Sequence, residues 1–435
     1  MPYLWYLALA IGLLVSPDAL ILLGNQMGSV GLAFLGAVVF AGGVALGTAY
    51  STAALYEQFP GAGGEALGLQ KALGTLPAIV LPLCARVVVL VCGSTGTLAI
   101  AGYVFNEVFV TWFPNLGFSF CLLGLLLVLN LLGPRVAHTA QLLFVAVALL
   151  GLFGLSAMAF LGDTLSLSTL MPVQPAPAVL LRGALGSLWL FVGVDLVRFT
   201  PLPQRQPALP LGQYMTCGIL LVGVTFCTWG LVSLGAVPAA TLANSTVPHM
   251  VTARTLFGQP GRMVMGIVVL AGVSGAVNVL LFGVSRMLVG MASQGFLPAL
   301  LAWAPQRAPV ALLLLALGPA TMMRLGMAGE PETEVYTRAG LIFWLLHYGA
   351  IHLAILVLGR RADWPPGWRV SRLLPGLGMS CMALGSVGLL WIDSTPDHLV
   401  AFMLIVGAGV SVLSLGWRGW SRRKGRAKRP SPGAH

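Results

Sequence analysis

The stretch LALAIGLLVSPDALILLGNQ (residues 7–26) has the length of a membrane span, yet Ser16, Pro17 and Asp18 interrupt it near its middle. Pro17 has no amide hydrogen and its ring clashes with the preceding helical turn, while serine and aspartate side chains bond exposed backbone groups. A helix in lipid bonds its own backbone, so a deep interruption is tolerated only where it lines a cavity or is buried in protein. The stretch therefore predicts a first helix that is broken at a functional site.

The carboxylate favours this interpretation over its alternative, a proline kink without function. An acid near the middle of a membrane costs about 3 kcal/mol on insertion scales and usually marks a substrate or ion path. We therefore expect Asp18 to bind substrate or a coupling ion, with Ser16 and Ala19 beside it in the substrate site.

The rest of the chain has the composition of a membrane protein. Of its 435 residues, 58% are hydrophobic and 8% are charged, whereas soluble domains carry about 25% charged residues. Apolar windows of about 20 residues, the length of a membrane span, recur almost to Trp417 and leave no room for a soluble domain. We expect about twelve helices, at roughly 3–25, 30–56, 76–105, 117–133, 138–161, 183–200, 209–235, 262–292, 309–326, 336–358, 373–392 and 398–417.

The basic residues predict the orientation of these spans. With twelve spans both termini lie on one side, and the loops and tail of that side hold 17 of the 23 Lys and Arg, against 5 on the other side and Arg86 within a span. Positive residues gather on the cytoplasmic side. Both termini are therefore expected in the cytoplasm, with the chain in the bacterial inner (plasma) membrane. The basic tail lacks aromatic interleaving, so we expect membrane lipid and not nucleic acid as its partner.

A second interruption is predicted in the sixth span, GALGSLWLFVGVDLVRFTP (183–201), where Gly193 weakens the helix and Asp195 is a second intramembrane acid. Broken helices at corresponding places in two inverted halves bring their backbone ends together near the middle of the membrane. Spans one and six therefore indicate an all-α membrane fold of two inverted five-helix repeats. The alternative for Asp195 is an interfacial residue that pairs with Arg198.

Three motifs, in this order and spacing, resemble those of the amino acid-polyamine-organocation permeases. They are FPGAGGEALGLQKALG (59–74) after the second helix, SLWLFVGVDLVRFTPLPQRQPALP (187–210) at the sixth, and GVSRMLVGMASQGFLPALLAWAPQRAPV (283–310) at the eighth. The eighth-helix motif is the strongest of the three. With the twelve-helix pattern the resemblance covers nearly the whole chain.

This resemblance implies where the repeats and the substrate site lie. One transmembrane domain (1–417) would contain repeat one (about 3–161), repeat two (about 183–358) and two accessory helices (about 373–417), followed by a basic cytoplasmic tail (418–435). Phe191, Gly193 and Asp195 match the sixth-helix substrate site of the family, and Trp189 matches a gating aromatic of its antiporter branch. From the residues alone, Trp189 and Phe191 are equally well explained as packing or lipid-facing side chains.

The first helix departs from the family, where a run such as Gly-Ser-Gly offers backbone amides to the substrate carboxylate. Here Pro17 has no amide, and an ionised Asp18 would itself occupy the positive end of the following half-helix. Two explanations stay open. Either the substrate is an amine without a carboxylate and Asp18 is its counter-ion, or Asp18 is protonated when an amino acid binds and so couples transport to protons. We lean slightly towards amines.

The remaining intramembrane polar residues leave the coupling ion open between H⁺ and Na⁺. Arg86 needs a carboxylate, with Asp18 and Asp195 as candidates, unless it snorkels to the cytoplasmic interface. Ser274 and Asn278 on the eighth helix are candidates for ion binding, although one such pair is weak evidence. Two histidines of the tenth helix are interpreted as packed residues that are also able to relay protons: His347 and His352.

The leading functional hypothesis is a secondary active transporter for an amino acid or related organic amine. The alternatives are a neutral amino acid exporter of the same family, and a receptor or scaffold that kept the fold without transport. An enzyme is not expected, because no nucleotide loop, metal-ligand cluster or Ser/His/Asp arrangement stands out. No cofactor is expected, and the oligomeric state and the direction of transport stay open.

Overall fold

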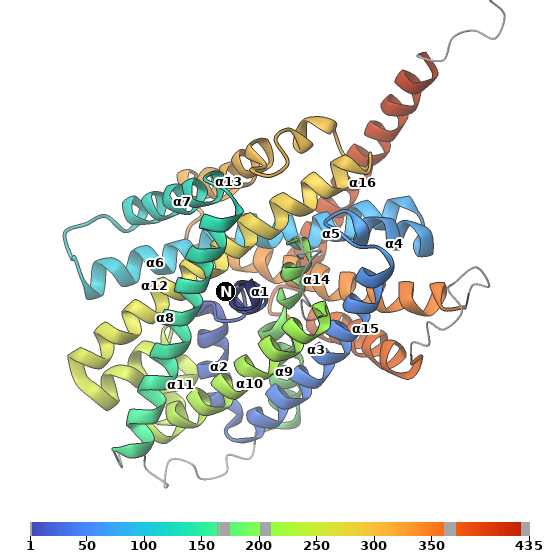
Figure 1. Cartoon of the computed structure of the whole chain (residues 1–435). Coiled ribbons are helices and arrows are strands. Elements are labelled where there is room, and N and C mark those ends of the chain that lie inside the picture. The colour runs from blue at the N-terminus through green and yellow to red at the C-terminus, as the bar shows by residue number, and fades with distance from the viewer. Residues whose placement is uncertain (1, 163–164, 166–174, 201–209, 361–370, 428–435) are drawn as a thin grey trace, which may run out of the picture.

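The computed structural model describes residues 2–162, 165, 175–200, 210–360 and 371–427, and every regular element in them is a helix (Figure 1). Nine helical stretches are long and apolar enough to cross a membrane, and two shorter apolar helices, α7 and α13, accompany them. With the broken first span these make twelve in the described part of the chain. The all-α fold expected from the sequence is confirmed.

The elements follow the predicted order closely. They are α1 (Pro2–Ile11), α2 (Pro17–Val30), α3 (Ala33–Gln58), α4 (Gly64–Leu73), α5 (Thr75–Val88), η1 (Val89–Gly93), α6 (Ser94–Val108), α7 (Asn115–Leu131), α8 (Pro134–Leu161), α9 (Pro177–Ser187), η3 (Leu188–Phe191), η4 (Val194–Phe199), α10 (Leu211–Ala236), α11 (Ala239–Asn244), α12 (Pro248–Ser293), η5 (Ala299–Ala302), α13 (Pro309–Arg324), α14 (Pro331–Leu358), α15 (Leu373–Ile392) and α16 (Pro396–Ala427).

Several regions differ from the expected boundaries, and α9 begins at Pro177 instead of about 183. A short helix, α4, occupies part of the predicted loop after the second span. The eighth span is preceded by a helical segment from Pro248, which joins it across a kink at Gly258, where φ is 62°. The tail is helical as far as Ala427, while its last part, 428–435, and the predicted loop residues 163–164 and 166–174 lie outside the described residues.

The first break has the local structure of a helix end followed by a new helix start. The amides of Leu14 and Val15 both bond the carbonyl of Ile11, which closes α1. Ser16 then adopts an extended conformation and its hydroxyl accepts a 3.4 Å hydrogen bond from the amide of Ala19, as an N-cap does. Pro17 fits the first position of α2 because that position needs no amide donor.

The second break depends on a glycine. Leu188–Phe191 is a tight 3₁₀ turn, Val192 is extended, and Gly193 has a φ of 98°, which side chains with a Cβ rarely adopt. A Cβ on Gly193 would lie 2.4 Å from Cδ2 of Leu13, so the two breaks also approach each other here. Gly193 is therefore required by its conformation and by its contact with the first break.

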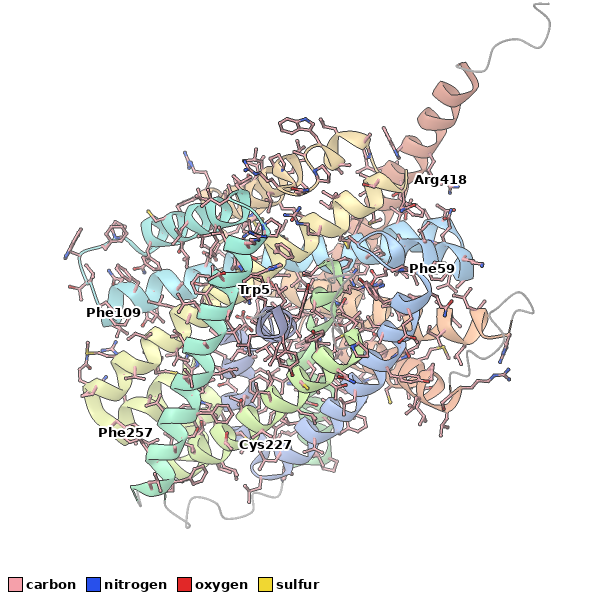
Figure 2. The ribbon with its side chains drawn as sticks, viewed as in Figure 1. Trp5, Phe59, Phe109, Cys227, Phe257 and Arg418 are labelled. Atoms are coloured by element: carbon pink, nitrogen blue, oxygen red, sulfur yellow. The ribbon has the colours of Figure 1, made fainter. Side chains whose placement is uncertain are left out.

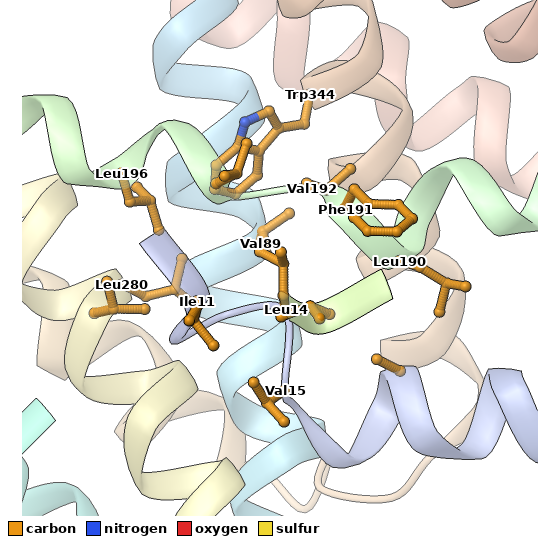
Figure 3. Close-up of a cluster of buried hydrophobic side chains, with 14 of the residues drawn as sticks. Ile11, Leu14, Val15, Val89, Leu190, Phe191, Val192, Leu196, Leu280 and Trp344 are labelled. Atoms are coloured by element: carbon orange, nitrogen blue, oxygen red, sulfur yellow. The ribbon is translucent and has the colours of Figure 1, made fainter. Parts of the chain in front are cut away.

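Both breaks lie in the interior of the helix bundle. In Figure 1, α1 is seen end-on near the centre of the molecule, and Figure 3 shows Ile11 and Leu14 of the first break in one apolar cluster with Val192 and Leu196 of the second. Figure 2 shows side chains along the outer faces of the helices. Many of these outer side chains are apolar, and Leu150 of α8, for example, is 72% exposed. Such faces suit contact with lipid, as expected of an integral membrane protein.

Candidate functional site

Asp18 is the accessible carboxylate at the first break. It stands in the first turn of α2, a helix that packs against α10, α11 and α12, and its side chain is exposed while Ser16, Pro17 and Ala19 are buried. Its Oδ2 atom accepts a 2.9 Å hydrogen bond from the hydroxyl of Thr97 on α6. The carboxylate is thus held by a neutral donor and stays open to a ligand within the bundle.

The amides that begin α2 are already occupied. Pro17 has none, the amide of Asp18 interacts with its own carboxylate, and the amide of Ala19 donates to the hydroxyl of Ser16. The amide of Leu20 donates to the carbonyl of Ser16 at 3.3 Å. This helix start therefore offers a negative group to a ligand and no free amide.

The sixth-span residues lie around Tyr348 of α14. The hydroxyl of Tyr348 accepts a 3.0 Å hydrogen bond from the amide of Gly193 and donates a 2.6 Å bond to Oδ1 of Asp195. Phe191 is buried and packs edge-on against Phe226, with ring centroids 6.3 Å apart. Trp189 is partly buried. The second break is thus fastened to α14 by a tyrosine that the sequence analysis did not select.

Asp195 belongs to a group of charged side chains that we call the buried ion cluster. Its members are Glu65 of α4, Arg86 of α5, Asp195 and Arg198 of η4, and His347 of α14, all buried. Arg86 bonds both oxygens of Glu65, at 2.6 and 3.0 Å, and also bonds Oδ2 of Asp195. Arg198 bonds Oε2 of Glu65 at 2.7 Å. The helix pair α4–α5 is therefore joined to η4 by ionic contacts, and to α14 through His347, whose Nε2 atom lies 3.2 Å from Oε1 of Glu65.

The cluster decides between the partners that the sequence left open. Arg86 pairs with Asp195 and Glu65, not with Asp18, and it is fully buried instead of snorkelling to an interface. Arg198 pairs with Glu65 and not with Asp195. The fold thus uses Asp195 to hold Arg86, while Asp18 stays free of ionic partners among the described residues.

Glu65 is the centre of the cluster and was missed by the sequence analysis. It lies in α4, outside the spans, where burial alone would raise its pKa, but the guanidiniums of Arg86 and Arg198 hold the pKa well below its usual range. In the sequence, Glu65 stands out only as the single acid of the motif at 59–74. Nothing in the spacing connects it to Arg86 or Arg198, which lie 21 and 133 positions further along the chain.

The two eighth-span candidates have hydrogen-bond partners within the protein. Ser274 donates to the carbonyl of Leu270 at 2.7 Å. Asn278 donates to Oε1 of Gln141 at 2.7 Å and accepts from Asn130 at 2.8 Å. The side chain of Asn278 therefore ties α12 to α7 and α8. Neither residue is brought to Asp18 by a bond in the described structure.

The fold and the site together indicate a general class of membrane protein. Two broken helices meet inside a bundle of apolar spans, and one of them presents an accessible carboxylate within the bundle. Such an arrangement is that of a membrane transporter.

The chain belongs to the amino acid permease family, whose model matches residues 3–413. This match confirms the resemblance to the amino acid-polyamine-organocation permeases and, with the fold, the expectation of a transporter and not an enzyme. No curated protein matches the chain by sequence.

Solved structures with a similar fold include the manganese transporter of Eremococcus coleocola. Its complex with an aromatic bis-isothiourea substituted compound aligns with a TM-score of 0.61 and 13% identity, covering 98% of this chain and 94% of that chain. A mutant of the same transporter aligns with a TM-score of 0.62, 12% identity and the same coverage. At this identity the likeness shows the transporter fold alone.

Proposed function

We propose that the protein is a secondary active transporter that moves an amino acid or a related organic amine across the membrane by alternating access. The observation that carries this proposal is the exposed carboxylate of Asp18 at the break of a span inside the bundle. An intramembrane carboxylate without an ionic partner is costly unless it serves a ligand or a proton. The substrate site would lie between the two breaks, with Ser16, Asp18 and Ala19 on one side.

An amine is the better fit of the two substrate chemistries. A substrate α-carboxylate would meet the like charge of Asp18 and would find the first amides of α2 already occupied. An ammonium group would instead pair with Asp18 in a site of low dielectric constant, where such a pair is strong. An amino acid is accommodated if Asp18 is protonated when it binds.

The sixth span would supply the other wall of this site. Phe191 and Trp189 would contact the apolar part of the substrate, and Gly193 would set the shape of the break. We further propose that the chain forms the two repeats and accessory helices expected from the sequence. Both termini would lie in the cytoplasm, in a bacterial inner membrane, because the basic residues gather on that side.

The test is transport by purified protein in lipid vesicles. We expect labelled amines to exchange across the vesicle membrane more readily than amino acids. The variant Asp18→Asn should lower amine exchange by on the order of tenfold or more, since the bound ammonium would lose its charged partner, which costs about 2 kcal/mol or more once the pair is enclosed. Asp18→Glu is the matched control because it retains the charge. Unchanged exchange in Asp18→Asn would refute the role given to this carboxylate.

The same vesicles separate the alternatives. A neutral amino acid exporter of the same family would move amino acids outward and ignore amines. A receptor or scaffold would bind a ligand, seen as a raised unfolding temperature, without moving it across the membrane.

A further inference from the structure

His347 is the one member of the buried ion cluster that is neither a carboxylate nor a guanidinium, and an imidazole is the side chain that proteins commonly use to take up and release a proton. The other four are two carboxylates and two guanidiniums, which balance each other. The side chain of His347 is fully buried, and its Nε2 atom lies 3.2 Å from Oε1 of Glu65 and 3.2 Å from NH2 of Arg86. Its protonation state therefore sets the net charge of the cluster.

The hydrogen bonds of Arg86 fix where the hydrogen of His347 lies. The NH2 group of Arg86 has two hydrogens, and these are directed to Oε2 of Glu65 and to Oδ2 of Asp195. None is left for His347. Its Nε2 atom must therefore carry the hydrogen and donate it to Oε1 of Glu65, so the Nδ1 atom of the neutral ring carries a lone pair.

That lone pair has no hydrogen-bond partner among the described residues, although the Nδ1 atom is buried. A proton added there would give the cluster a net positive charge, and the new N–H group would face no acceptor. Both changes are strongly unfavourable in a buried site. The arrangement of the cluster in this structure is therefore incompatible with a protonated His347. Protonation at Nδ1 requires either that α14 moves away from its partners or that water reaches the new N–H group.

The charged groups around His347 come from three elements, α4, α5 and η4. They are Glu65 of α4, Arg86 of α5, and Asp195 and Arg198 of η4, while Tyr56 of α3 lies beyond, with its ring 6.0 Å from the guanidinium of Arg198. Among these groups only His347 takes up a proton without breaking a carboxylate–guanidinium pair. The added proton therefore belongs to the histidine.

The cluster is connected to the second break by hydrogen bonds. Asp195 accepts from the hydroxyl of Tyr348, and the same hydroxyl accepts from the amide of Gly193. Trp344 also donates to Asp195, at 3.3 Å. A rearrangement of the cluster thus changes the hydrogen bonds that hold the second break in place. The net charge of the cluster is therefore linked to the shape of the proposed substrate site.

We propose that Nδ1 of His347, with Glu65 as the partner of its Nε2 atom, is a proton-binding site that couples transport to H⁺. In this scheme the neutral histidine locks α4, α5, η4 and α14 together. Protonation breaks these contacts, and the substrate site then opens towards the side of the membrane where α4 lies. The inference rests on the proposed transport function, and it assigns the coupling proton to His347 instead of Asp18.

The experiment measures protons and substrate together in vesicles that contain the purified full chain and a trapped pH-sensitive dye. Wild-type protein should move H⁺ with a labelled amine in a fixed ratio. His347→Gln, which keeps an amide donor for Glu65 and cannot titrate, should lower the ratio of H⁺ to substrate by on the order of tenfold. His347→Asn, with a shorter amide side chain, is a second variant to be used if the His347→Gln protein does not fold.

His352→Gln is the matched control. It lies on the same helix and is also buried, but its partners are the hydroxyls of Thr48 and Ser51, at 3.2 and 2.9 Å. Its H⁺ to substrate ratio should equal that of the wild type. An unchanged ratio in the His347 variants would overturn the proposal, as would wild-type transport without H⁺ movement, which would leave the proposed function standing. A wild-type protein that moves no substrate would instead refute the proposed function itself.

Discussion

Thr97 on α6 donates a 2.9 Å hydrogen bond to the carboxylate of Asp18 on α2, so the first and third spans meet at the residue proposed to bind substrate. The same hydroxyl also donates to the carbonyl of Gly93 at 2.6 Å, one turn earlier in the chain. A hydroxyl has one hydrogen, which these two acceptors must share. Thr97 therefore positions Asp18 without neutralising its charge.

Replacement of Thr97 by valine should weaken amine binding. Valine has nearly the same shape, so the change removes the donor and leaves the packing, and a hydrogen bond to a charged group contributes about 1.5–3 kcal/mol. We expect the apparent affinity for an amine to fall by about tenfold in vesicle exchange. Thr97→Ser keeps the hydroxyl and serves as the control. Equal affinities for the two variants would mean that Thr97 does not position Asp18.

Gly193→Ala should destabilise the fold at the contact between the two breaks. The positive φ of 98° disfavours any Cβ, and this Cβ would also lie 2.4 Å from Leu13. Strain of this kind costs about 1–3 kcal/mol, which should lower the unfolding temperature in detergent.

Gly295→Ala is the control for that contact. Gly295 follows the end of α12 with a φ of 78°, and no atom lies within 4 Å of its Cβ position. Its substitution should cost the conformational strain alone. The double variant Gly193→Ala with Leu13→Ala should recover part of the difference, and a purely additive result would argue that the breaks are not in contact.

The buried ion cluster should tolerate balanced changes better than single ones. Glu65→Gln leaves two guanidiniums against one carboxylate in a buried site, where breaking such a pair costs about 3–5 kcal/mol. Glu65→Gln combined with Arg198→Met restores one positive and one negative charge, Arg86 and Asp195. We therefore expect a higher unfolding temperature for the double variant than for Glu65→Gln. The reverse order would contradict the ionic role given to Glu65.

The sequence predicted the fold well because its signals are local. Pro17 and Gly193 each act on the backbone where they stand, so the two breaks followed from the residues around them. The intramembrane acids were likewise visible as single charges in apolar sequence. The partners of these charged residues could not be predicted, because Arg86 contacts Asp195, 109 residues away in the chain, and His347, 261 residues away. Pairing of this kind depends on how the spans pack, and periodicity within one span carries no information about it.

The role of Glu65 likewise could not be predicted from the sequence. In the sequence this residue is an ordinary acid of a loop motif, whereas the structure buries it against His347 of α14 and between two arginines. Asn278 and Ser274 were selected for their polarity, and the structure gives Asn278 amide partners on α7 and α8. Polarity within a span thus identifies a residue that needs a partner, and the fold decides whether that partner is protein or ligand.

Asp393, in the turn between α15 and α16, should make stability depend on pH in acid. It accepts hydrogen bonds from Nε and NH2 of Arg338 at 2.8 and 3.2 Å and from the amide of Thr395 at 2.8 Å. Burial on its own would raise the pKa of Asp393, but these donors outweigh it, so its pKa lies below the ordinary value of about 4. A carboxylate with a lowered pKa contributes stability that is present above its unfolded pKa and is lost as the pH falls through its folded pKa.

The difference between wild type and Asp393→Asn isolates this contribution from that of the other acids. At pH 7 the variant should unfold at a lower temperature, by an amount that corresponds to about 1.5–3 kcal/mol for a hydrogen bond to a charged group. The gap should narrow below about pH 4 and close once Asp393 is protonated in the wild type. Glu334→Gln is the control, because Glu334 also bonds Arg338 but its side chain is 74% exposed, and exposed pairs contribute little. A gap that stays constant from pH 7 to pH 3 would show that the charge of Asp393 does not hold α14 to this turn.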